Sequence, residues 1–175
     1  MHPTLLRSMI LQGLALNLGT MTWLKPHFPT LDERAGLVAK ALPSWAIASS
    51  HTAGWVWTGM GSPEPWSVLR RQSPGLSPLE RTRWSAKLLS PLHHRAVTIG
   101  TLWLLDRRST AMEVLLHAPD IDASAAQLII LEEHCRVPLH ELVLARRSLA
   151  VSKAKASATL AHLATLRELY PDIAR

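Results

Sequence analysis

Cysteine, tyrosine and phenylalanine are nearly absent from this chain of 175 residues, which holds one of each. Because Cys135 is the single cysteine, no internal disulfide can form, and we expect a reducing, cytoplasmic location. No stretch reaches the roughly 20 continuous apolar residues that span a bilayer, so we expect no membrane segment. Gln12 and Asn17 interrupt the apolar run at residues 9–21, and no small-residue cleavage site follows, which argues against a signal peptide.

Signatures of catalysis are also missing. The sequence holds no G-x-S-x-G elbow, no phosphate-binding G-x-x-x-x-G-K-[ST] loop and no G-x-G-x-x-G. Residues 132–135 read Glu-Glu-His-Cys, but no second convergent pair accompanies these metal-compatible side chains. We therefore expect no enzyme, no cofactor and no metal site. We interpret His51 as a packed core histidine, and His93 and His94 as an exposed loop pair, with phosphate contact as the alternative.

Hydrophobic residues make up 47% of the chain, and the formal net charge is +6. The length fits one domain, or one domain with a small appendage, and the hydrophobic content is sufficient for a core. The positive charge favours an anionic partner, most often nucleic acid, but a merely basic protein would have the same composition.

Residues 46–61, AIASSHTAGWVWTGMG, organise the rest of the chain. The first three predict a buried strand, and Ser49 and Ser50 are favourable N-cap residues for a following helix. Gly59 and Gly61 end that helix. The spacing i, i+3, i+4, i+7 gives it one apolar stripe, on which we expect Trp57 to be a buried core anchor: Ala53, Val56, Trp57 and Met60.

The same stretch resembles a known family. Ser-His-Thr-Ala-Gly-Trp at residues 50–55, followed by Pro-Glu-Pro-Trp at residues 63–66, is similar to the AbiEi antitoxins of bacterial type IV toxin–antitoxin systems, in their actinobacterial branch. Residues 109–115 resemble the second half of a further family segment, although Ser109 stands where the family has arginine. The residues that carry the likeness or the core are Ser50, His51, Ala53, Trp55, Trp57, Trp66, Thr110 and Glu113.

The resemblance implies an N-terminal winged helix-turn-helix, of which residues 1–29 are a shortened remnant, and an antitoxin domain at residues 30–175. Residues 11–16 resemble the last helix of the winged unit, and Leu11, Leu14, Ala15 and Leu18 share one helical face. Residues 20–25 correspond to the wing, with a short strand at residues 21–24. A complete winged helix needs on the order of 60 residues, so a packing element without DNA recognition is the alternative.

The remaining pattern predicts an α+β fold: a small mixed or antiparallel sheet covered by helices, with a helical C-terminal half. Thr30 and Glu33 form a capping box for a helix with Leu31, Ala35, Val38 and Leu42 on one face. We expect strands at residues 66–69 and 82–88, the latter from its alternation, and a loop at residues 70–81. Residues 97–105 predict a hairpin that turns at Gly100. Helices follow with these inward residues: Ala125, Leu128 and Ile129 after an Asp122 cap; Leu139, Leu142 and Val143 after Pro138; and Ala156, Leu160, Leu163 and Tyr170 in the last, at residues 153–170.

The basic side chains are concentrated between residues 65 and 110, and we expect seven of them to contact DNA phosphates: Arg70, Arg71, Arg81, Arg83, Lys87, Arg107 and Arg108. By resemblance the protein is an antitoxin and transcriptional autoregulator that neutralises a nucleotidyltransferase toxin and binds promoter DNA, and a homodimer is an open expectation. The alternative is a non-enzymatic protein-interaction domain whose basic face does not bind DNA.

Overall fold

A computed structural model describes residues 15–18, 21–24, 29–71, 76–84, 86–90, 94–117, 121–145 and 150–169. The predicted α+β fold is confirmed. A mixed five-stranded sheet has the order β5-β4-β3-β7-β6, in which β3 lies antiparallel to β4 and parallel to β7. The strands are β3 (Ala46–Ala48), β4 (Val68–Arg70), β5 (Lys87–Leu88), β6 (Ala96–Ile99) and β7 (Leu102–Leu105).

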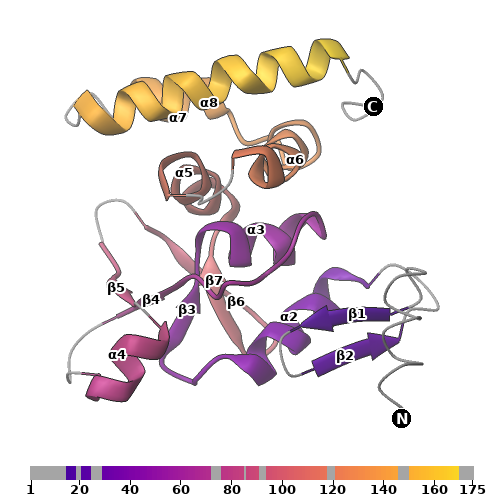
Figure 1. The fold of residues 1–175 in the computed structure, drawn as a ribbon, viewed down its shortest axis with the longest axis vertical. Coiled ribbons are helices and arrows are strands. Elements are labelled where there is room, and N and C mark those ends of the chain that lie inside the picture. The colour runs from indigo at the N-terminus through magenta and orange to yellow at the C-terminus, as the bar shows by residue number, and fades with distance from the viewer. Residues whose placement is uncertain are drawn as a thin grey trace.

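Helices lie on the sheet and continue away from it as further layers (Figure 1). The helices are α2 (Leu31–Ala41), α3 (Ser50–Thr58), α4 (Pro78–Trp84), α5 (Arg107–His117), α6 (Ile121–Glu133), α7 (Leu139–Ala145) and α8 (Ala150–Leu169). Helix α3 contacts α2, α5 and α6, and therefore connects the sheet layer to the helical C-terminal half. No described helix has the length and apolar character to cross a bilayer.

Local sequence signals account for the start of α2 and for the β6–β7 hairpin. Thr30 donates its backbone N–H to Glu33 Oε2 (2.7 Å) and accepts the Glu33 amide at its hydroxyl (3.3 Å), so the predicted capping box is confirmed. Ala35, Val38 and Leu42 are buried as expected. Gly100 adopts φ +56° between β6 and β7, a conformation that glycine reaches without the steric cost of a Cβ.

Helix α3 follows its predicted strand and ends at Gly59 in the left-handed conformation, as expected. Ser49 is its N-cap residue, but the Ser49 side chain does not cap an amide; its hydroxyl instead lies 3.1 Å from the Ser67 hydroxyl. The prediction of Trp57 as a buried core anchor is confirmed only in part, because Trp57 packs against two core clusters but is half-buried, whereas Trp55 is 1% exposed. Trp55 packs in the cluster formed by α2, α3 and the sheet.

The prediction of a strand at residues 82–88 is wrong for most of that range. Residues 78–84 form α4, and only Lys87–Leu88 is a strand, paired parallel to β4. Ser77 and Glu80 make a second capping box, in which Ser77 N–H donates to Glu80 Oε2 (2.9 Å) and the Glu80 amide donates to Ser77 Oγ (3.2 Å). The Ser77 amide and the Ser77 hydroxyl (2.8 Å) both donate to the Glu80 carboxylate, and these two bonds lower the pKa of Glu80. Helix α4 begins at Pro78, a residue favoured at the first helical position, and its capping box overrides the apparent alternation.

Two strands form a separate antiparallel hairpin near the N-terminus, β1 (Ala15–Leu18) and β2 (Met21–Leu24). The strand at residues 21–24 is confirmed. The helical face expected to include Ala15 and Leu18 is wrong there, because their backbone pairs with β2 in register. Leu11 and Leu14 lie outside the described residues.

The C-terminal helices confirm most of the inward positions. Ala125, Leu128, Ile129, Leu139, Leu142 and Leu163 are buried, and Leu160 packs against the same cluster. Helix α6 begins at Ile121, one residue before the expected Asp122 cap, and α8 begins at Ala150 rather than residue 153. The side chains of Val143, Ala156 and Tyr170 lie outside the description.

Candidate functional site

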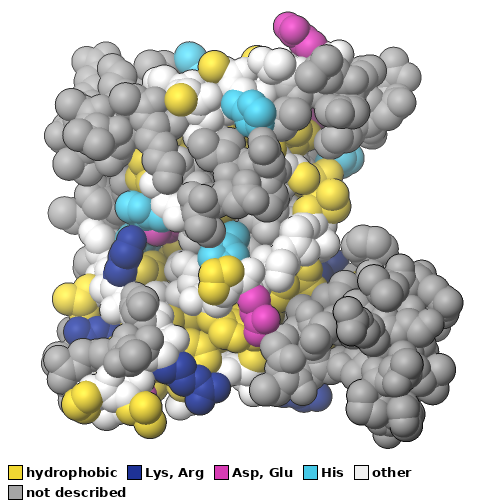
Figure 2. Space-filling view, viewed as in Figure 1, with side chains coloured by type: hydrophobic (Ala, Val, Ile, Leu, Met, Phe, Trp, Pro, Cys, Tyr) yellow, Lys and Arg dark blue, Asp and Glu magenta, His cyan; other side chains and the backbone are white. Residues whose placement is uncertain are grey.

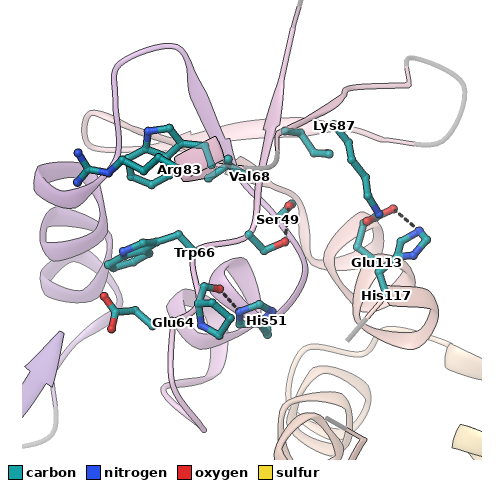
Figure 3. A pocket seen from close by; sticks show the side chains of 13 residues that line it. Ser49, His51, Glu64, Trp66, Val68, Arg83, Lys87, Glu113 and His117 are labelled. Carbon is teal, nitrogen blue, oxygen red and sulfur yellow. Dashed lines mark hydrogen bonds and ion pairs between the residues drawn. The ribbon is translucent and has the colours of Figure 1, made fainter. Parts of the chain in front are cut away.

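A groove of about 740 Å³ opens where the first turn of α3 meets β4, β5, α4 and α5 (Figure 3). The N-terminal end of α3 contributes Ser49 and His51, and α5 contributes Glu113 and His117. The remaining lining residues come from the segment before α4 and from α4 and β5: Glu64, Pro65, Trp66, Ser67, Val68, Leu69, Arg83, Trp84 and Lys87.

One wall of the groove combines aromatic rings with a cation. The Arg83 guanidinium lies 5.0 Å from the centroid of the Trp84 ring, a distance at which the cation is attracted to the ring face. Trp84 is held by an edge-to-face contact with Trp45, with ring centroids 6.5 Å apart. Trp66 is half-buried and lies between Arg83 and Glu64 in Figure 3. Arg83 itself is exposed, so its charge remains accessible from solvent.

His51 lines the groove as a neutral imidazole. Its Nε2 bonds the Pro65 carbonyl, and because a carbonyl can only accept, Nε2 carries the proton. Burial lowers the pKa of His51, although the bond to Pro65 acts in the opposite direction. Its Nδ1 is buried and has no hydrogen-bond partner in the described part of the chain. The prediction of a packed histidine is consistent with this geometry.

Glu113 lies at the other end of the groove between two histidines. His94 Nε2 is 2.8 Å from Glu113 Oε1, and His117 Nε2 is 3.8 Å from the same oxygen. The Glu113 residue is only 5% exposed. Burial acts to raise the pKa of Glu113, but the bond from His94 and the positive charge of His117 and Lys87 prevail, so its pKa lies below the ordinary value. Glu113 is therefore a buried carboxylate held in its ionised form.

The protonation of His94 follows from its second hydrogen bond. The Ser90 amide donates to His94 Nδ1 (3.0 Å), so Nδ1 is unprotonated and Nε2 donates to Glu113. A metal ion would need the lone pair of Nε2, which this arrangement occupies with a proton. Among the described residues, no group of three or more His, Cys, Asp or Glu side chains is arranged to hold a metal.

The exposed histidine pair expected at residues 93–94 is wrong for His94, which is half-buried; His93 lies outside the described residues. The role of Glu113 as the centre of a charged cluster could not be seen in the sequence, except through His117, which stands four residues later on the same helical face. His94 reaches Glu113 only through the fold.

The residues of the family resemblance come together around α3 and α5. Ser50 Oγ lies 3.4 Å from the Glu113 carbonyl, and Ala53 and Trp55 are buried on α3. Two more side chains bond one carbonyl, that of Leu105: Trp57 Nε1 at 2.9 Å and Thr110 Oγ1 at 3.0 Å. These contacts join α3 to the start of α5, so the residues that make them stabilise the packing of the two helices.

The basic residues expected to contact DNA that the structure describes have different surroundings. Arg83 and Lys87 line the groove. Arg71 lies 3.7 Å from the centroid of Trp103, and Arg107 lies 4.9 Å from that of Trp57, near the opposite end of α3. Arg108 is exposed on α5, and Arg81 is in α4 with its side chain outside the description.

Arg70 is less exposed than Arg71, Arg83, Lys87, Arg107 and Arg108. Its Nε and Nη1 atoms are buried and have no hydrogen-bond partner within the described ranges. A guanidinium with two nitrogens withdrawn from solvent is poorly placed for a surface phosphate contact. The expectation that Arg70 contacts DNA therefore has less structural support than the same expectation for Arg83 or Lys87.

Comparison with known proteins gives no match to any family model, curated protein or solved structure. The lining of the groove in this α+β protein combines aromatic rings, two exposed cations and a buried carboxylate cluster.

Proposed function

We propose that this protein is an AbiEi-type antitoxin and transcriptional autoregulator that neutralises a nucleotidyltransferase toxin and binds its own promoter DNA in the cytoplasm. One observation carries the DNA-binding part: five of the seven residues predicted to contact phosphates are exposed, namely Arg71, Arg83, Lys87, Arg107 and Arg108. In the part of the chain that the structure describes, none of the five forms an ion pair with a carboxylate. Each is thus available to a phosphate, and each such contact adds salt-dependent affinity.

The antitoxin part of the proposal rests on the family resemblance. The residues that carry it lie on α3 and at the start of α5, which are the elements that join the sheet to the C-terminal helices. We assign the neutralising activity to residues 30–175 and treat residues 1–29 as a shortened winged-helix remnant that influences DNA affinity or dimer formation.

The DNA-binding part is tested by a mobility shift on the duplex upstream of the protein's own gene, over a series of salt concentrations. We expect affinity to fall steeply with salt, because association releases counterions. Arg83→Glu and Arg81→Glu should weaken binding across sequences with little change in specificity. Lys40→Glu is the matched control, since Lys40 is an exposed cation in the last turn of α2. A folded protein that does not bind at low salt would contradict the proposal.

The toxin-neutralising part is tested by co-expression with a nucleotidyltransferase encoded next to this gene. Growth should be rescued by the full chain and by residues 30–175 alone, with melting curves recorded for both proteins. Loss of rescue by a truncated protein that is still folded would assign the protective activity to residues 1–29 and refute the division proposed above.

A second candidate function is a protein-interaction domain without DNA binding. Two exposed leucines favour it: Leu79 on α4 is 79% exposed and Leu88 on β5 is 58% exposed. A partner that covers such a side chain removes apolar surface from water, which favours association. Rescue of growth without any shift of promoter DNA would select this candidate.

A further inference from the structure

We infer that the groove between α3, α4 and β5 binds an unpaired nucleotide of a single-stranded nucleic acid, with its base on Trp66 and its flanking phosphates on Arg83 and Lys87. The inference rests on the proposed nucleic-acid-binding function and names the form of nucleic acid that enters this site. It separates the two groove cations from Arg71, Arg107 and Arg108, which lie outside the groove lining.

The size of the groove selects a single strand over a duplex. Its volume of about 740 Å³ lies within the range of sites that enclose small organic ligands. A duplex keeps its bases stacked inside and presents a convex backbone, with a major groove alone about 12 Å wide. An unpaired nucleotide can turn its base into a hollow of this size, which is how aromatic side chains reach bases in single-strand sites.

The lining supplies both surfaces that an unpaired nucleotide needs. Trp66 offers a half-buried ring, and base–aromatic stacking tolerates any base because every base has a π-face. Arg83 comes from α4 and Lys87 from β5, on different sides of the groove, so a strand laid across it meets a cation on each side (Figure 3). Figure 2 shows hydrophobic side chains with Lys, Arg, Asp, Glu and His side chains among them on this face.

The two carboxylates of the lining are compatible with this ligand. Glu113 is bonded to His94 and lies close to His117, and Lys87 acts on it electrostatically, so its charge is offset locally. Glu64 lies on the far side of Trp66 from Arg83 (Figure 3). A carboxylate also accepts hydrogen bonds from the exocyclic amine of a base such as cytosine.

The test is fluorescence anisotropy with three labelled probes: a ten-nucleotide deoxycytidine strand, its ribonucleotide equivalent, and the promoter duplex. We expect Trp66→Leu to weaken single-strand binding roughly 10- to 100-fold, the range for removing one stacking ring, and to leave duplex binding within about twofold. Arg83→Gln should weaken binding of the single strand, and the affinity of this variant should depend less on salt. The tighter of the two single strands identifies DNA or RNA as the ligand.

Arg136→Gln is the matched control, because Arg136 is exposed, does not line the groove and has no proposed contact with nucleic acid, and it should leave single-strand affinity within about twofold. Melting curves recorded by circular dichroism show whether each variant is folded. If Trp66→Leu does not fold, Arg83→Gln is used to test the inference, because Arg83 is exposed. Wild-type single-strand affinity in both Trp66→Leu and Arg83→Gln would overturn the inference while leaving promoter binding intact. Single-strand binding that both groove variants weaken, together with no binding to the promoter duplex, would instead contradict the proposed autoregulator function and support the inference.

Discussion

Replacing Gly54 with alanine tests a close contact between α3 and α6. Gly54 lies within α3, and a Cβ built there would approach Gln127 Oε1 to 2.2 Å and Gln127 Cδ to 2.8 Å. Gln127 is 1% exposed and donates from Nε2 to the carbonyls of His51 (3.1 Å) and Met60 (2.9 Å). Its amide therefore cannot move away without breaking both bonds.

The magnitude follows from two opposing effects. Alanine is favoured over glycine inside a helix by about 1 kcal/mol. Against this, losing two hydrogen bonds costs about 1 kcal/mol each, and overpacking a buried site costs about 1–3 kcal/mol. We expect Gly54→Ala to lower the free energy of unfolding by about 2–4 kcal/mol, measured by urea denaturation.

Gly36 provides a matched control for the same substitution. It lies exposed in α2, and a Cβ there would meet nothing within 4 Å, so Gly36→Ala should raise the free energy of unfolding by up to about 1 kcal/mol. In a Gln127→Ala background the obstruction is gone, and adding Gly54→Ala should be neutral or stabilising. If Gly54→Ala stabilises the protein while Gln127 is present, the close approach of α3 and α6 is not as described.

Further substitutions test the core and the titratable groups. Trp55→Ala should lower the free energy of unfolding by ~3–5 kcal/mol, the range for a fully buried aromatic residue. Trp57→Phe should lower it by only about 1 kcal/mol, because Trp57 is half-buried and loses the hydrogen bond to the Leu105 carbonyl. Equal losses for the two variants in chemical denaturation would refute this difference. Arg34 donates to the Val56 carbonyl (2.8 Å) at the end of α3, and Arg34→Met should cost on the order of 2–3 kcal/mol by the same measurement; an unchanged midpoint would contradict this. The pKa of Glu113 is lowered on folding, so ionised Glu113 stabilises the fold above the unfolded pKa near 4.5, and this stabilisation is lost as pH falls through the folded pKa. Glu113→Gln should therefore reduce the dependence of the free energy of unfolding on pH in acid. An unchanged dependence would show that Glu113 does not stabilise the fold in this way. The pKa of His51 is also lowered on folding, so the protein is most stable above pH 6.5, where His51 is neutral, and loses stability as pH falls below 6.5. His51→Asn should remove this loss of stability. If the loss persists in thermal melts of the variant, a group other than His51 causes it.

Local signals in the sequence determined the elements that depend on neighbouring residues. The capping box of Thr30 and Glu33 satisfies amides within one turn, so α2 could be located without knowing the fold. Gly59 and Gly100 each adopt positive φ at the place where a helix ends or a hairpin turns. The capping box of Ser77 and Glu80 is equally local, but the alternation at residues 82–88 predicts a strand that forms only at Lys87–Leu88.

Only the tertiary structure decided which side chains are buried and which converge. Trp55 and Trp57 have similar local surroundings, and their different burial depends on how α3 packs between the sheet and α5. Glu113 meets His94 across 19 positions of sequence, and Arg83 and Lys87 share a groove because α4 and β5 follow one another at the sheet edge, whereas Arg107 lies near Trp57. Periodicity fixes a residue's direction on its own element, but a site needs the relative placement of several elements, which long-range packing sets.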